Sequence, residues 1–241
     1  EGPPNFSVGF IIDDIDFTGI GMPGLLFDIQ QVEVLRGPQS SIFGANAMAG
    51  LISIRSAEPI SHFESYIQTT IATDNTRRVG ISVNTPVLAN LDTRFSVFSN
   101  ETDGFRENQY RNITNSDGKT ELLIRNKSTW SSYSFIQFDL TALYSEQNNK
   151  YDAWAPDNNE KLITYSDLEG KDSQTSRAFS LRSHVQDVLG FDLLSITSYS
   201  QNELEHSYDG DWGNLDYWAD EPYQYYEGNQ AYFSEEACIT K

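Results

Sequence analysis

The sequence predicts a mainly β protein with long antiparallel strands of the kind that cross a bilayer. Apolar and polar residues alternate along segments such as 77–87 and 134–146, which gives each strand one apolar and one polar face. Most predicted strands exceed the about 5–6 residues usual in soluble proteins and match the roughly 9–11 residues of a tilted membrane strand. The connections alternate between short and long, as they do in membrane β-barrels.

Eight such strands are expected after residue 60. They cover residues 63–73, 77–87, 93–101, 120–130, 134–146, 177–188 and 191–203, and the eighth starts near Tyr232. From the second strand onward, the connections are in turn short and long: 88–92, 102–119, 131–133, 147–176, 189–190 and 204–231. A barrel with short turns at one end and long loops at the other explains this alternation, and a soluble sandwich gives no reason for it.

The segment 77–87 shows the expected division into faces most clearly. One face carries Val79, Ile81, Val83, Thr85 and Val87, and the other carries Arg78, Gly80, Ser82, Asn84 and Pro86. Because successive side chains of a strand point to opposite sides, only the first face is suited to an apolar environment.

The first sixty residues have a different pattern. We expect short strands at 8–16, 29–35 and 51–56, separated by the turn-rich residues 16–24 and a group of small residues at 38–50. This group predicts a short helix or tight turns, with Pro38 at a first helical position and Gly44 and Gly50 as stops. Pro59 closes the segment.

Composition excludes several classes of protein. The formal net charge is -19 and no basic cluster is present, which excludes a nucleic-acid partner. The chain is 38% hydrophobic and 13% aromatic, too much for a disordered chain. Cys238 is the one cysteine, so an internal disulfide and a CxxC motif are excluded. No secretion signal opens the sequence, and we expect a mature piece cut at both ends.

Catalytic and metal-binding motifs are missing from the sequence. His62, His184 and His206 are scattered without ligand spacing, and no GxSxG segment occurs. The glycines of 37–50 lack both the GxxxxGK[ST] and the GxGxxG spacing of phosphate-binding loops. We therefore expect no enzyme, no cofactor and no metal site.

The stretch 207–228 combines aromatic and acidic residues. It holds two Trp and five Tyr, and residues 201–230 contain eight acids and no Lys or Arg. One interpretation is an extracellular mouth whose aromatic faces contact a ligand and whose carboxylates bind divalent ions. The candidate ligand contacts are Trp154, Tyr208, Trp212, Tyr217 and Trp218. The alternative is a solvated loop whose aromatic residues pack locally.

The run FDIQQVEVLRGPQSSIFGANAMAGLISIRSAEP, from Phe27 to Pro59, resembles the C-terminal signature of the plug domain of TonB-dependent outer-membrane receptors. The matching pieces are VEVLRGP at 32–38, IFG at 42–44, AG at 49–50 and LISI at 51–54. IIDDI at 11–15 resembles the family's IDG strand, with Asp14 where the family often has glycine; Phe43 and Ala49 are smaller departures. TDGFREN at 102–108, LLSITSYS at 193–200 and YDGDW at 208–212 resemble pieces of the first third of such barrels.

The resemblance implies an incomplete architecture: residues 1–60 as the C-terminal part of an α+β plug domain, and 61–241 as about the first eight strands of a large transmembrane β-barrel. It assigns Arg36 to pairing with barrel carboxylates, whereas a solvated arginine at a strand end is the alternative. The expected plug signature and plug–barrel contacts are Glu33, Arg36, Gly37, Pro38, Gly44 and Gly50.

The function that the resemblance implies is active transport of a scarce nutrient across the bacterial outer membrane. The expected partners are a TonB-type energy-coupling protein, outer-membrane lipid and a small iron chelate, with a ferric siderophore as the first choice of ligand. Cobalamin, haem or an oligosaccharide is the alternative ligand. From a different class, the alternative is a secreted acidic all-β carbohydrate-binding module.

Overall fold

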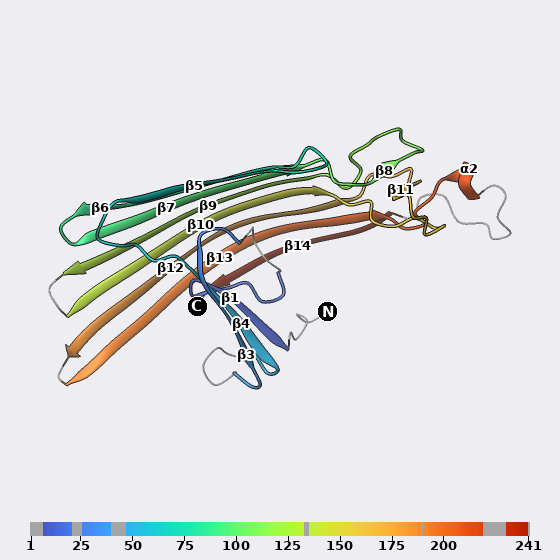
Figure 1. The fold of residues 1–241 in the computed structure, drawn as a ribbon. Coiled ribbons are helices and arrows are strands. Elements are labelled where there is room, and N and C mark those ends of the chain that lie inside the picture. The colour runs from blue at the N-terminus through green and yellow to red at the C-terminus, as the bar shows by residue number, and fades with distance from the viewer. Residues whose placement is uncertain are drawn as a thin grey trace.

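A computed structural model describes residues 7–20, 26–39, 47–132, 135–188, 190–218 and 230–240, with the backbone alone for residue 188 and for 230–240 (Figure 1). The described strands form a four-stranded sheet with the order β2-β1-β4-β3 and an eight-stranded sheet with the order β14-β13-β12-β10-β9-β7-β6-β5. We refer to them as the N-terminal sheet and the wall.

The N-terminal sheet is built from the three predicted strand segments. It contains β1 (Val8–Ile12), β2 (Ile15–Asp16), β3 (Ile29–Arg36) and β4 (Gly50–Ser56), with β1 parallel to β4 and β3 antiparallel to it. The predicted strand 8–16 divides in two because Asp13 and Asp14 form a tight turn, in which both residues have positive φ angles of 48° and 68°. Two positive φ angles are the signature of a type I′ hairpin turn.

The wall is an up-and-down antiparallel sheet. Its strands are β5 (Glu64–Ile71), β6 (Arg77–Leu88), β7 (Leu91–Thr102), β9 (Lys119–Ser132), β10 (Ile136–Lys150), β12 (Lys171–Val188), β13 (Phe191–Asp209) and β14 (Gln230–Thr240). All eight predicted strands are confirmed. β12 and β13 are longer than predicted, because polar residues continue the backbone pairing as far as Lys171 and Ser207 after the apolar alternation ends.

The described parts of the long connections lie at one end of the wall, as Figure 1 shows. They carry the short strands β8 (Glu107–Asn108) and β11 (Ile163–Thr164), which pair in parallel, and the one-turn helix α2 (Leu215–Trp218). The helix or turns expected around 38–50 fall largely on residues 40–46, which lie outside the described residues. Within the described part of the chain, no helix is long and apolar enough to cross a membrane.

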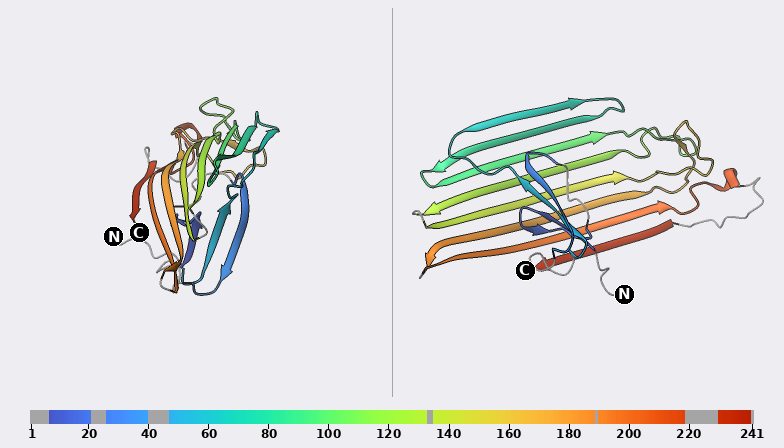
Figure 2. Two further views of the ribbon diagram at one scale, coloured as in Figure 1. Left: turned by 90° about the vertical axis from the view of Figure 1, so that its left-hand side faces the viewer. Right: turned by 60° about the horizontal axis from the view of Figure 1, so that its bottom comes forward.

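The two faces of the wall differ in polarity. The N-terminal sheet lies against one face, here called the inner face, on the concave side of the curved wall (Figure 2). The predicted division of 77–87 is confirmed, since Gly80, Ser82 and Asn84 point inward. The opposite, outer face exposes large apolar side chains: Ile67, Ile71, Val79, Ile81, Val87, Phe95, Leu140, Phe179, Leu181 and Leu193.

The main hydrophobic core lies between the N-terminal sheet and the wall. Ile12, Ile15, Phe17, Phe27 and Ile54 pack against residues of the inner face, namely Phe98, Leu123, Leu143 and Ala178. Because neither sheet buries its apolar side chains without the other, the N-terminal sheet and the wall stabilise each other.

Candidate functional site

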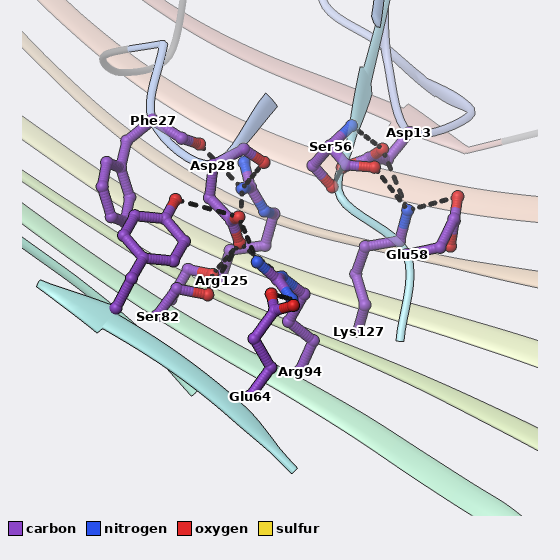
Figure 3. Close-up of polar contacts among 12 residues, drawn as sticks. Asp13, Phe27, Asp28, Ser56, Glu58, Glu64, Ser82, Arg94, Arg125 and Lys127 are labelled. Atoms are coloured by element: carbon purple, nitrogen blue, oxygen red, sulfur yellow. Dashed lines mark hydrogen bonds and ion pairs between the residues drawn. The ribbon is translucent and has the colours of Figure 1, made fainter. Parts of the chain in front are cut away.

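The contact between the N-terminal sheet and the inner face is centred on Asp28, the residue that precedes β3. Its carboxylate accepts two hydrogen bonds from the Arg94 guanidinium of β7, at 2.9 Å from Nε and 2.7 Å from Nη2 (Figure 3). Both side chains are almost fully buried, with exposed fractions of 3% and 7%. Such a two-point arginine–carboxylate pair fixes orientation as well as position.

Further groups of the wall enclose the same carboxylate. Ser82 and Ser96 donate their hydroxyl hydrogens to Oδ2 of Asp28, and the Tyr66 hydroxyl donates to Oδ1 at 3.0 Å. Arg125 donates from Nη2 to the main-chain oxygens of Phe27 and Asp28, at 2.8 and 2.9 Å. We call Asp28 with Arg94, Arg125, Tyr66, Ser82 and Ser96 the Asp28 hub.

The hub strongly favours the ionised form of Asp28. Burial raises the pKa of this carboxyl group, but the hydrogen bonds from Arg94 and Ser96 and the positive charge of Arg94 outweigh burial and bring the pKa down to about 2. Asp28 is therefore a fixed negative charge at any physiological pH.

Phe27 supplies the apolar half of the same contact. Its ring stacks on Phe98 of β7, with centroids 5.0 Å apart, and packs against Tyr66 of β5 at 5.6 Å. A Cβ atom on Gly80 would collide with the Phe27 ring, so β6 carries the one residue type that lets the ring reach the wall.

A second contact forms at the β1–β2 turn. The Asp13 carboxylate accepts hydrogen bonds from the main-chain nitrogen and the hydroxyl of Ser56, at 2.9 and 2.6 Å, and pairs with Lys127 of β9 at 3.3 Å (Figure 3). The Lys127 ammonium also pairs with Glu58 at 2.8 Å. From β12, the Ser180 hydroxyl donates to the Asp13 main-chain oxygen at 2.8 Å. The turn is thus tied to two strands of the wall.

Asp14, next in the turn, pairs with Arg182 of β12. The Arg182 guanidinium donates from Nη2 to Oδ1 at 2.6 Å and from Nε to Oδ2 at 3.0 Å. This pair is about a third exposed, with side-chain exposed fractions of 31% for Arg182 and 29% for Asp14. Asp14, which stands where TonB-dependent receptors often have glycine, therefore makes an ion pair that glycine could not make.

The structure places the expected plug residues outside these two contacts. Arg36 and Pro38 are exposed at the end of β3, and within the described residues Arg36 forms no ion pair. Glu33 accepts a hydrogen bond from Gln31 at 2.8 Å. Pairing of Arg36 with barrel carboxylates therefore stays a prediction, and Gly44 lies outside the described residues.

Two of the expected glycines have a clear backbone role. Gly37 has a φ angle of 89°, a left-handed conformation that favours glycine. At Gly50 a Cβ atom would lie 2.6 Å from the main-chain oxygen of Leu35, so a side chain there would separate β3 from β4.

The candidate ligand-contact residues gather among the long loops. Trp154 stacks on Trp212 with centroids 5.6 Å apart, and Tyr217 packs against Trp218 at 5.0 Å. Tyr208 lies 6.4 Å from Tyr151, at the end of β13. Trp154 remains 56% exposed, so it combines local packing with an accessible aromatic surface. Contact with a ligand stays a prediction.

The charged residues of both contacts were not identified from the sequence. A signal was present: Arg94, Arg125, Lys127 and Arg182 lie within predicted membrane strands, on the polar face. A charge at membrane depth must face the interior and find a partner. The partners Asp13, Asp14 and Asp28 carried no such signal, because each lies in a turn or at a strand end.

These features define a class of protein: a small sheet held by buried ion pairs on the polar face of a long-stranded wall whose other face is apolar. Comparison with known proteins gives the same class. No family model matches the chain. The pesticin receptors of Yersinia enterocolitica and Yersinia pestis are 29% identical to it over 83 residues, which is 34% of this chain and 12% of theirs.

Solved structures match over most of the chain. The ferric yersiniabactin uptake receptor FyuA from Yersinia pestis has a TM-score of 0.73 at 18% identity, covering 86% of this chain and 33% of that one. The pyoverdine outer-membrane receptor FpvA from Pseudomonas aeruginosa has a TM-score of 0.69 at 15% identity, covering 86% and 33%. The ferric-catecholate import receptor Fiu from E. coli has a TM-score of 0.66 at 16% identity, covering 98% and 37%.

The chain therefore has the fold of the plug and adjoining barrel strands of TonB-dependent siderophore receptors, and the resemblance seen in the sequence is confirmed. It spans about a third of the length of these solved receptors and 12% of the pesticin receptors.

Proposed function

We propose that this chain is part of a bacterial outer-membrane receptor that takes up a ferric siderophore, driven by a TonB-type energy-coupling protein. Residues 1–60 form the end of its plug and residues 61–241 the first strands of its barrel. The receptor is not an enzyme. Its partners are the coupling protein, outer-membrane lipid and a ferric chelate, and it does not act on nucleic acid.

One observation carries this proposal: the N-terminal sheet is bound by ion pairs to the polar face of a wall whose outer face is apolar and exposed. Soluble proteins rarely expose contiguous apolar patches beyond a few hundred Å², and larger ones mark membrane or protein contacts. Stacked aromatic pairs, Trp130 with Phe138 and Phe179 with Tyr199, lie along this outer face. Aromatic residues at the membrane boundaries are typical of outer-membrane barrels.

The names of the similar proteins support the choice of ligand. The solved structures are described as a ferric yersiniabactin uptake receptor, a pyoverdine outer-membrane receptor bound to pyoverdine, and a ferric-catecholate import receptor. Cobalamin, haem and oligosaccharides stay alternatives for the same transport mechanism. A secreted carbohydrate-binding module is disfavoured, because such a module has no use for the apolar outer face.

The test is iron uptake by a strain lacking the gene that encodes this chain. Radioactive iron is supplied as ferric yersiniabactin, ferric pyoverdine or a ferric catecholate, with haem and cyanocobalamin as comparators. We expect the deletion to abolish uptake of one ferric chelate, a plasmid copy to restore it, and an uncoupler of the proton gradient to abolish it again. Unchanged uptake of every ferric chelate would contradict the proposal, as would release of the protein from cells without detergent.

A further inference from the structure

A polar groove of about 640 Å³ lies at the loop end of the wall, on the outer face. We call it the rim groove. Outward-facing residues of five neighbouring strands line it: Glu101 of β7, Thr120 of β9, Asn148 and Lys150 of β10, Lys171 of β12 and Glu205 of β13. Their place on the outer face follows from the alternation of side chains along each strand. Lys171, for example, lies eight positions before the outward-facing Phe179, and β12 pairs regularly with β10 over this stretch.

Residues of the long loops complete the rim groove. Lys150 donates from its ammonium group to Oδ1 of Asn115 at 2.9 Å, and from its main-chain nitrogen to the main-chain oxygen of Gly118 at 2.9 Å. At Gly170 a Cβ atom would lie 1.8 Å from the main-chain oxygen of Tyr151, so only glycine lets this loop approach the end of β10 so closely. Defined contacts between loops and strands therefore give the groove its shape.

The chemistry of the rim groove is polar throughout. Every described side chain that lines it ends in a hydroxyl, amide, carboxylate or ammonium group. Lys171 pairs with Glu205, but the two side chains remain 42% and 36% exposed. An ammonium group has three donors and a carboxylate about four acceptor sites, so one ion pair leaves most of them available. Hydroxyl groups both donate and accept, and a ligand rich in them, a saccharide, matches this mixture of groups.

The groove begins at the membrane boundary and rises above it. On β9, Thr120 lies two positions beyond Leu122, the last apolar residue of the outer face of that strand. On β12, Lys171 lies eight positions beyond Phe179. Eight residues span about 27 Å along a strand, which is a height of about 20 Å for a strand tilted by about 45°. The polar layer of a phospholipid bilayer is only about 5–8 Å thick on each side. A phospholipid head therefore ends well short of Lys171, whereas an oligosaccharide head reaches it.

We propose that the rim groove binds the saccharide head of an outer-leaflet glycolipid whose acyl chains lie against the apolar outer face below it. The long loops of outer-membrane barrels are extracellular, so the groove faces the outer leaflet. The proposal goes beyond transport, because it rests on the location of the barrel in the membrane and not on the transported ligand.

Two variants of the full-length receptor test the groove, and a third is the matched control. Asn148→Ala combined with Lys171→Ala removes two polar groups and breaks only an exposed ion pair, so the fold should tolerate it. Thr120→Val removes a hydroxyl group without changing charge. The control is Arg177→Ala, on the same face of β12 but six positions nearer the membrane and outside the groove. Heat-modifiable mobility on gels checks that each variant is folded.

The measurement is native mass spectrometry of delipidated receptor titrated with three lipids. They are lipopolysaccharide with a complete core oligosaccharide, lipopolysaccharide truncated to its innermost sugars, and phosphatidylglycerol. We expect the wild-type receptor to bind the complete form about tenfold more tightly than the other two lipids. The Asn148→Ala, Lys171→Ala double variant should lose this tenfold preference, Thr120→Val should reduce it about threefold, and Arg177→Ala should preserve it.

Three results would overturn the proposal. Equal affinity of the wild-type receptor for complete and truncated lipopolysaccharide would show that the outer sugars are not bound. An equal loss of affinity in the Arg177→Ala variant would place the contact at the membrane boundary instead of the groove. If the free core oligosaccharide binds as tightly as the intact glycolipid, the ligand is a soluble sugar. None of these measurements uses a ferric chelate, so failure of the proposed uptake function would leave their results unchanged.

Discussion

Arg94 and Asp28 form a two-point ion pair across the boundary between the plug and the wall, joining positions 66 residues apart in the sequence. The plug supplies the carboxylate and the wall supplies the guanidinium. The same polarity recurs at the turn, where Asp13 and Asp14 meet Lys127 and Arg182. In the described contacts, carboxylates of the plug are thus bound by basic side chains on the inner face of the wall, although the chain as a whole is acidic.

Asp28→Asn should destabilise the docked plug strongly. The variant keeps the shape of the side chain but leaves Arg94 and Arg125 without their buried counter-charge, which costs about 3–5 kcal/mol in comparable buried pairs. Protease sensitivity of the plug and urea denaturation of the full-length receptor measure the change. The control is Arg177→Ala, because Arg177 pairs with Glu203 at 3.2 Å with both side chains about half-exposed, and such pairs contribute about 0–1 kcal/mol. Similar losses of stability in the Asp28→Asn and Arg177→Ala variants would contradict the expectation that the buried pair contributes more than the exposed one.

Docking of the plug should be insensitive to pH across the physiological range. The pKa of Asp28 is lowered to about 2, below its ordinary value of 3.8, so its contribution to stability is complete above pH 4 and is lost as the pH falls through 2. Intrinsic fluorescence of the receptor from pH 7 to pH 2 measures this. The Asp28→Asn variant should lack the acid transition. A wild-type transition centred near pH 5 and absent from the variant would show that the hub does not hold Asp28 ionised.

Gly80→Ala should loosen the same contact by a steric route. The added Cβ would collide with the Phe27 ring, and overpacking of this kind costs about 1–3 kcal/mol. The expected result is a lower urea midpoint with an unchanged slope. Adding Phe27→Leu to Gly80→Ala should recover part of the loss, because the smaller side chain leaves room for the methyl group. A double variant less stable than the sum of both single changes would rule out the clash as the cause.

Neighbouring aspartates of the turn should respond unequally. Asp13→Ala removes a buried acceptor that bonds Ser56 and Lys127, which should cost about 3 kcal/mol or more. Asp14→Gly loses an ion pair that is about a third exposed but removes the penalty of its left-handed backbone, about 1–2 kcal/mol. Its net effect on stability should therefore lie within about 1 kcal/mol of zero. Urea denaturation of the full-length receptor measures the stability of both variants. A larger loss of stability for Asp14→Gly than for Asp13→Ala would contradict the expectation that the more deeply buried carboxylate contributes more.

Trp154→Ala should weaken uptake more than it weakens the fold. Its ring stacks on Trp212 and is 56% exposed, so we expect stability to fall by about 0.5–1.5 kcal/mol. If the exposed face contacts the chelate, the concentration for half-maximal uptake should rise about tenfold, which corresponds to about 1.4 kcal/mol. The control is Phe105→Ala, an equally exposed aromatic residue at 59% outside this stacked pair. Equal uptake in both variants would argue for local packing alone.

The local pattern of the sequence was sufficient to predict the strands and their faces. Alternation in 77–87 correctly separates Val79 and Ile81, on the outer face, from Ser82 and Asn84, on the inner face, because side chains of a strand alternate whatever lies around it. The same reasoning began β12 too late, at residue 177 instead of Lys171, and ended β13 too early, at residue 203 instead of Asp209. Beyond the apolar region, pairing between neighbouring strands continues the sheet without any change in residue pattern.

Which charges meet across the plug–wall boundary was decided by the tertiary structure. The VEVLRGP segment drew attention to Arg36, yet the buried ion pairs of the described residues use Asp13 and Asp28. An ion pair between distant segments depends on how one sheet is placed against the other, which no local periodicity encodes. A strand and its two faces can be predicted from the alternation of apolar and polar residues along a short segment. The ion pair between Asp28 and Arg94 forms only once the plug is packed against the inner face of the wall.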